Sequence, residues 1–177
     1  MKATGIVRRI DDLGRVVIPK EIRRTMRIRE GEPLEIYTDR DGEVIFKKYS
    51  PVGELSALAG ACAEALSRTA GCPVVVCDRD VVITAVGGAR KELGGKMISP
   101  AFEAQMEERQ PLVRGSGEEP AAIVEGMQRS QPVAMSPILL DGDVIGAVAL
   151  LGDGAGSEVE LKLSMAAAAF LARQLET

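Results

Sequence analysis

Residues 49–53, with the sequence Tyr-Ser-Pro-Val-Gly, interrupt the patterning of the chain and constrain its fold more than any other segment. Pro51 disfavours a helical conformation for Ser50 and is typical of the start of a new element. A chain of 177 residues can form one ordinary domain or two small ones. We therefore place a short linker at 49–53 and expect two domains, at residues 1–50 and 53–177.

Charge separates the same two segments. The whole chain has 22 Lys and Arg against 26 Asp and Glu, a net charge of −4, which by itself argues against binding to nucleic acid. The first fifty residues carry twelve basic and nine acidic side chains, whereas the remaining 127 carry ten and seventeen. Within residues 1–29 the numbers are nine and three. This asymmetry indicates two modules with different partners.

The residue types exclude most catalytic chemistry. The chain has no His, so it lacks the usual general base and every zinc site that needs imidazole. Its three cysteines have no CxxC spacing and are expected to be free thiols. Gly94-Gly-Lys-Met97 lacks the first glycine and the Ser or Thr of a phosphate-binding loop. We expect no enzyme activity, no metal and no cofactor.

The sequence has no segment with the pattern of a signal peptide or a membrane span. Its longest run of apolar residues and glycine, Val144 to Leu151, is eight residues long, far shorter than a transmembrane helix. We therefore expect a cytoplasmic protein without a membrane partner.

The first fifty residues read as a small unit of strands around one short helix. Two strands are expected at 6–10 and 15–18, on either side of the turn Asp11-Asp-Leu-Gly14. A helix is expected at 20–26, and alternating runs at 34–38 and 44–47 flank Asp41-Gly42, which is a strong hairpin signal. A unit of this size buries too little apolar surface to be stable alone. We expect it to form an obligate dimer.

Arginines dominate the basic segment, with seven of the nine basic residues in 1–29. The planar fork of Arg suits phosphate oxygens and the acceptors of guanine. Arg8 and Arg15 flank the first turn, and Arg23 and Arg24 lie on the short helix. Composition alone leaves two interpretations open: a solvated, ion-paired surface, or a surface that binds nucleic acid.

The segment from Lys2 to Arg24 resembles the N-terminal motif of AbrB-type transition-state regulators, and its core, Asp12-Leu-Gly-Arg-Val-Val-Ile-Pro-Lys-Glu-Ile-Arg-Arg24, is specific to that family. The match continues through 29–36 and is strongest with a sporulation regulator of the family. The resemblance implies an intertwined dimer in a swapped-hairpin β-barrel, and control of sporulation genes as activator and repressor. It also implies sequence-dependent binding of double-stranded DNA, partly through DNA shape. The residues expected at the DNA are Arg8, Arg15, Arg23 and Arg24, with Arg9 and Lys20 on phosphates.

The same barrel also serves antitoxins, so the fold alone does not establish the function. Antitoxins of this kind carry a disordered tail that wraps a partner, whereas residues 53–177 read as a folded domain. A protein-binding module of the antitoxin type stays open as an alternative.

Residues 53–177 are expected to form an α+β domain with an antiparallel sheet. A helix is expected from 52 to 71, strands at 73–77, 81–86, 121–124, 133–140 and 144–151, a short helix at 100–108, and a closing helix at 157–175 with Ser157 as its N-cap. The order resembles a GAF domain, and Ile138 to Ala149 resembles the final hairpin of that family. The resemblance implies a sensor of small molecules, but no ligand-contact motif is present, and a domain that only assembles the protein is the alternative.

The closing helix carries apolar residues around much of its circumference, including Ala166-Ala-Ala-Ala169. Packing on its own sheet needs only one apolar stripe, so a partner helix is expected as well. We expect the first and last helices of two GAF-like domains to pack together, which would join two barrel dimers into a tetramer. An unidentified small-molecule effector is the remaining expected partner.

Overall fold

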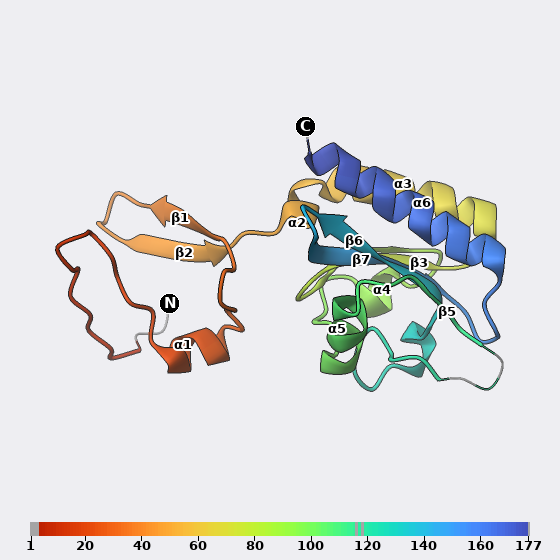
Figure 1. Cartoon of the computed structure of the whole chain (residues 1–177), viewed down its shortest axis with the longest axis horizontal. Coiled ribbons are helices and arrows are strands. Elements are labelled where there is room, and N and C mark those ends of the chain that lie inside the picture. Colours follow the sequence, from red (N-terminus) through yellow and green to blue (C-terminus); the bar gives the residue numbers. More distant parts are fainter. Residues whose placement is uncertain (1–3, 116, 118, 177) are drawn as a thin grey trace. The chain divides into compact units, whose positions relative to one another are not determined.

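The computed structural model describes residues 4–115, 117 and 119–176 and divides the chain into two compact units, Met1–Tyr49 and Ser50–Thr177. Each unit is an α+β structure (Figure 1). The predicted class, helices combined with antiparallel sheets, is confirmed.

The N-terminal unit consists of an extended arm, one short helix and one hairpin. Helix α1 spans Lys20–Thr25, and strands β1 (Leu34–Thr38) and β2 (Val44–Lys48) pair antiparallel, with Leu34 opposite Lys48 and Thr38 opposite Val44. Asp39 stabilises the hairpin turn because its carboxylate accepts hydrogen bonds from the backbone N–H groups of Asp41 and Glu43. Gly42 adopts a φ of 82°, a conformation that suits glycine. The predicted helix and hairpin are confirmed.

The two strands predicted at 6–10 and 15–18 are absent from the single chain. The turn between them does form, because the Asp11 N–H donates to the Arg15 carbonyl at 3.0 Å. Apart from this hydrogen bond, the described residues of the arm show no pairing of backbone groups between strands. Their apolar side chains face solvent: Val7 is 85 % exposed and Val17 is 69 % exposed. An extended segment becomes a strand only where another backbone accepts its hydrogen bonds, and one chain does not supply that backbone here.

The C-terminal unit is built on a five-stranded antiparallel sheet in the order β4-β3-β7-β6-β5. The strands are β3 (Val74–Asp78), β4 (Val82–Val86), β5 (Leu112–Val113), β6 (Pro132–Leu140) and β7 (Asp143–Leu151). Helices α3 (Ser56–Ala70) and α6 (Glu158–Leu175) cover one face, and α4 (Arg90–Leu93) and α5 (Pro100–Glu107) lie on the other (Figure 1).

Alternation along the strands separates two cores, one on each face of the sheet. Val74 and Val76 belong to the core under α3 and α6, whereas Val75 and Cys77 belong to the core under α4 and α5. The second core is filled by large side chains such as Phe102, which is fully buried. The predicted N-cap of α6 is confirmed, since Ser157 and Glu160 form a capping box.

Three other expectations differ from the structure. Helix α2 (Pro51–Glu54) begins inside the expected linker, because the Ser50 hydroxyl caps it by accepting from Gly53 N–H. Residues 121–124 are a loop rather than a strand. Ile123 is fully buried there, and its backbone bonds to Ser99 and Ser130 instead of to a neighbouring strand. Strand β5 was not expected, because only two residues form it.

Candidate nucleic-acid interface

The basic residues expected at DNA stand on two adjoining elements of the N-terminal unit. Arg8, Arg9 and Arg15 lie on the extended arm, before and after the Asp11–Gly14 turn. The Asp11 carboxylate orders this turn by accepting from Leu13 N–H at 3.0 Å and from Arg15 N–H at 2.7 Å. The turn therefore determines the direction in which the chain leaves toward Arg15.

Helix α1 carries the other predicted residues, with Lys20 at its first position and Arg23 and Arg24 in its last turn. The arm and the helix are joined directly by Ile18 and Pro19, and Pro19 is the N-cap of α1. Basic side chains in the last turn also interact favourably with the C-terminal end of the helix dipole. The structure thus places the six residues on two neighbouring segments, and their joint action on one DNA stays a prediction.

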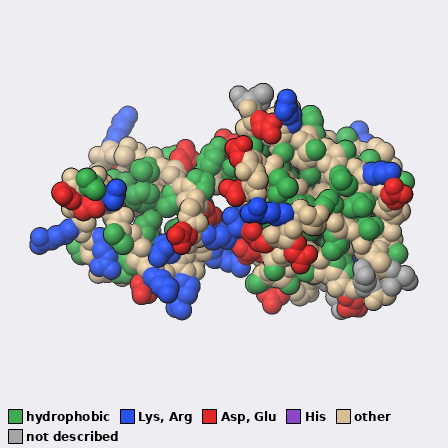
Figure 2. Space-filling view, in the orientation of Figure 1, with side chains coloured by type: hydrophobic (Ala, Val, Ile, Leu, Met, Phe, Trp, Pro, Cys, Tyr) green, Lys and Arg blue, Asp and Glu red, His purple; other side chains and the backbone are tan. Residues whose placement is uncertain are grey.

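Five of these six side chains are exposed: Arg8, Arg9, Arg15, Lys20 and Arg24. Among the described residues, no acidic side chain pairs with them. Arg23 is half-buried, and its Nε is buried without a hydrogen-bond partner in the described part of the chain. Figure 2 shows Lys and Arg side chains at the surface of the N-terminal unit, with apolar side chains between them.

Two further basic residues of this unit are held inside it by Glu32. Its carboxylate accepts from Lys48 Nζ at 3.0 Å and from Arg29, and its side chain is only 8 % exposed. Sequence reasoning did not identify Glu32. The Arg29–Glu32 spacing of three residues was a local signal for one pair, but the Lys48 contact depends on the fold.

The thiols of the C-terminal unit have the environment of structural residues. Burial raises the pKa of Cys77 to about 12, so the thiol stays protonated near neutral pH. Burial also raises the pKa of Cys62 and of Cys72, which pack against the core under α3 and α6. Among the described residues no group of three or more His, Cys, Asp or Glu side chains could hold a metal ion. In the same part of the chain, no helix is both long and apolar enough to span a membrane.

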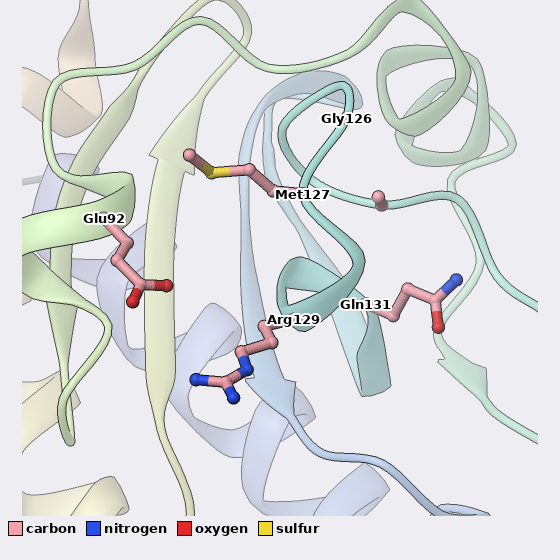
Figure 3. Close-up of a pocket in the computed structure, with 6 residues that line it drawn as sticks. Glu92, Gly126, Met127, Arg129 and Gln131 are labelled. Carbon is pink, nitrogen blue, oxygen red and sulfur yellow. The ribbon is translucent and has the colours of Figure 1, made fainter.

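A pocket of about 520 Å³ opens beside α4 in the C-terminal unit. Its lining includes Glu92, Met127, Arg129 and Gln131. The carboxylate of Glu92 and the guanidinium of Arg129 extend toward the same side of the pocket (Figure 3). Neither pairs with another charged side chain in the described residues. The pocket can therefore offer both an acidic and a basic group to a small molecule.

Two family profiles match the chain, one over each unit. The profile described as "Stage V sporulation protein T C-terminal, transcription factor" matches residues 54–176. The profile described as "Antidote-toxin recognition MazE, bacterial antitoxin" matches residues 7–53.

Two curated relatives come from Bacillus subtilis (strain 168). Stage V sporulation protein T is 52 % identical over 178 residues, which cover 99 % of each chain. The transition state regulatory protein AbrB is 63 % identical over 51 residues, which cover 29 % of this chain and 52 % of AbrB.

Among solved structures, the N-terminal DNA recognition domain of Bacillus subtilis AbrB is 63 % identical and covers 29 % of this chain and 94 % of that domain, with a TM-score of 0.26. A GAF domain/HD domain protein from Geobacter sulfurreducens covers 69 % of this chain and 92 % of its own, at 15 % identity and a TM-score of 0.50. The C-terminal unit therefore has the GAF-like fold expected from its order of elements.

Proposed function

The chain belongs to the family of stage V sporulation protein T transcription factors, and we propose that its N-terminal unit contacts double-stranded DNA through the arm and α1. Arg8, Arg15, Arg23 and Arg24 are the proposed contacts to base edges or to a narrow groove, and Arg9 and Lys20 the contacts to phosphate. The observation that carries the proposal is that five of these six cations are exposed and unpaired with acids in the described residues. If these cations instead stabilised the fold through ion pairs, each would lie beside an acidic side chain, as Lys48 lies beside Glu32.

The test of DNA binding is a salt series with the full-length protein and a duplex selected by it from a random-sequence pool. Binding through several phosphates releases counterions, so the logarithm of the association constant is expected to fall linearly with the logarithm of salt concentration. With four or more phosphates neutralised, the slope is about −4 or steeper. An affinity that does not respond to salt would contradict the proposal.

We further propose that two chains complete the N-terminal unit as an intertwined dimer. Among described residues 4–49, Pro19 alone is buried, while apolar side chains such as Val7, Ile10 and Val17 are exposed. A unit without a core of its own is not stable as a monomer. A partner arm would supply both the missing apolar cover and the strand partner that 6–10 and 15–18 lack.

The tetramer is a separate proposal about the C-terminal unit. On α6, Val159, Met165 and Phe170 are exposed, although large apolar side chains usually face a core or a partner. Sedimentation of the full chain is expected to give a tetramer, and Phe170→Glu to give dimers, because a buried charge would disfavour the second interface. Lys91→Glu, on the opposite side of the sheet, is the control and should stay tetrameric. A wild-type monomer would contradict both interfaces.

A second proposed function, sensing of a small polar effector, rests on the pocket beside α4. The unpaired charges of Glu92 and Arg129 favour a molecule that carries groups of both signs. In a thermal-shift screen of zwitterionic metabolites against the full chain, at least one compound is expected to raise Tm, and Arg129→Gln to abolish that shift. A shift that survives Arg129→Gln, or no shift with any compound, would argue against this site.

The cytoplasmic location stays a prediction.

The antitoxin function, the alternative to DNA binding, stays a prediction as well. The antitoxin profile covers only residues 7–53, and residues 50–177 form a folded unit rather than a partner-wrapping tail. This arrangement favours transcriptional control through DNA, with no catalytic role proposed.

A further inference from the structure

The basic residues of the N-terminal unit fall into an outer and an inner set. The outer set, on the arm and α1, is largely exposed and contains the proposed DNA contacts. The inner set comprises Arg29 and Lys48, whose side chains are each only 23 % exposed and converge on the carboxylate of Glu32. The inner set therefore forms ion pairs within the unit, and the proposed DNA contacts do not include it.

Glu32 and Lys48 join two segments that are distant in sequence. One oxygen of Glu32, Oε2, accepts from the backbone N–H of Arg29 at 2.7 Å, and Oε1 lies 3.0 Å from Lys48 Nζ. Lys48 Nζ also donates to the backbone carbonyl of Arg27 at 2.8 Å. The end of β2 is thereby tied to the loop that follows α1, with both charges held away from bulk solvent.

This tie acts directly on the end of α1. The helix has only six residues and no side-chain N-cap, so its own hydrogen bonds stabilise it weakly. Arg27 closes it in the left-handed region at φ 53°, unusual for a residue other than glycine, and Ile28 N–H donates to the Arg23 carbonyl at 2.7 Å. The hydrogen bond from Lys48 Nζ to the Arg27 carbonyl holds this left-handed backbone in place. Arg27 lies within one helical turn of Arg23 and Arg24, so the same bond stabilises the end of α1 that carries them.

We propose that Glu32 is a positioning residue for DNA binding, which holds the end of α1 so that Arg23 and Arg24 present their guanidinium groups in a fixed geometry. The inference rests on the proposed function, because it takes α1 as part of the DNA surface. Glu32 itself does not contact DNA. It acts through Lys48 and through the backbone at Arg27 and Arg29.

Charge and position predict opposite results for Glu32→Gln. The substitution removes one negative charge per chain, so electrostatics alone would tighten binding to a polyanion. If Glu32 positions α1, the loss of its carboxylate removes one ion pair from the half-buried Lys48 and loosens the loop that follows the helix. Positioning therefore predicts weaker binding despite the more positive protein.

The matched control is Glu30→Gln, which makes the same change of charge two residues away. Glu30 is exposed and has no side-chain bond or ion pair in the described residues. On the duplex selected by the wild-type protein, we expect Glu32→Gln to weaken binding about tenfold or more. We expect Glu30→Gln to bind as tightly as wild type or a few times more tightly.

Glu32→Asp separates positioning from a loss of charge. It keeps the carboxylate but shortens the side chain by one methylene, so its affinity should lie between those of wild type and Glu32→Gln. Charge alone predicts the reverse order, with Glu32→Gln the tightest. The ratio of affinities for the selected duplex and for an unrelated duplex should fall for Glu32→Gln, because misplaced arginines still attract phosphate.

Two outcomes would overturn the inference: Glu32→Gln binding as tightly as Glu30→Gln, or Glu32→Asp binding no better than Glu32→Gln. If Glu32→Gln unfolds the N-terminal unit, the comparison of Glu32→Asp with the wild-type protein decides the matter, because the two have the same charge and differ only in where the carboxylate lies. Equal affinities of these two proteins would then overturn the inference. Failure of the wild-type protein to bind any duplex would instead refute the proposed function, and would be seen before a variant is compared.

Discussion

Replacement of Arg24 by alanine is expected to weaken binding to the selected duplex about thirtyfold. Arg24 is exposed in the last turn of α1 and has no acidic partner in the described residues. In a dimer the substitution removes two guanidinium groups, and at about 1 kcal/mol each, the lower end of the range for a specific contact, the loss is about 2 kcal/mol. The protein's own fold should be unaffected, because the Arg24 side chain makes no bond to another residue that the structure describes.

The salt dependence distinguishes the kind of contact. If each Arg24 neutralises one phosphate, the slope of the salt series should become shallower by about 1.8, which is about 0.9 for each copy. A base contact would instead reduce the preference for the selected duplex over an unrelated one and leave the slope nearly unchanged.

Arg40→Ala is the control for this experiment. Arg40 lies in the turn between β1 and β2, is exposed, and its side chain makes no hydrogen bond or ion pair among the described residues. Its removal changes the net charge by the same amount, so general attraction to DNA falls equally in both variants. Equal affinities of the two variants would mean that Arg24 has no specific place at the DNA.

Local signals were sufficient to predict several parts of the fold. Asp41-Gly42 between two alternating runs predicts a hairpin that needs only neighbouring residues, and the structure contains it. The capping box at Ser157 is equally local, since Ser157 and Glu160 satisfy each other's backbone N–H groups. Such features depend on a few consecutive residues and so can be recognised without the fold.

Features that depend on distant backbone could not be predicted in the same way. The run 121–124 has the apolar composition of a strand, yet Ile123 covers the core from a loop because no strand lies beside it. The runs 6–10 and 15–18 have a strand pattern, but no described backbone pairs with them in a ladder, so the pattern alone does not make them strands. For the candidate site, the sequence located the arginines, but it did not reveal Glu32, whose contact with Lys48 spans sixteen residues.

Asp78 is a second residue whose importance depends on such distant contacts. It lies at the end of β3 and is only 8 % exposed. Its Oδ2 accepts from the hydroxyl of Ser50 at 2.7 Å, and its Oδ1 accepts from the backbone N–H groups of Asp80 and Val81, each at 2.7 Å. One carboxylate therefore joins the first residue of the C-terminal unit to the turn between β3 and β4.

Asp78→Ala is expected to destabilise the C-terminal unit by about 3 kcal/mol, because it leaves three donors without their acceptor in a mostly buried place. For a unit of this size the loss corresponds to a fall in Tm of about 10 °C, measurable by calorimetry. Asp78→Asn keeps an oxygen for the two backbone donors, and its amide can donate to the Ser50 hydroxyl, so a loss of less than about 1.5 kcal/mol is expected. Asp153→Ala, at an exposed position without a side-chain bond in the described residues, is the control.

Loss of the hydrogen bond between Ser50 and Asp78 is also expected to loosen the junction between the two units. The same hydroxyl that donates to Asp78 accepts from Gly53 N–H and so begins α2 at the boundary between Tyr49 and Ser50. In Asp78→Ala the Ser50 hydroxyl no longer bonds to the end of β3, so the first turn of α2 should unfold locally more often. Trypsin cleavage after Lys48 is then expected to be faster than in the wild-type protein at a temperature where both remain folded. Unchanged cleavage together with an unchanged Tm would show that Asp78 does not anchor the junction.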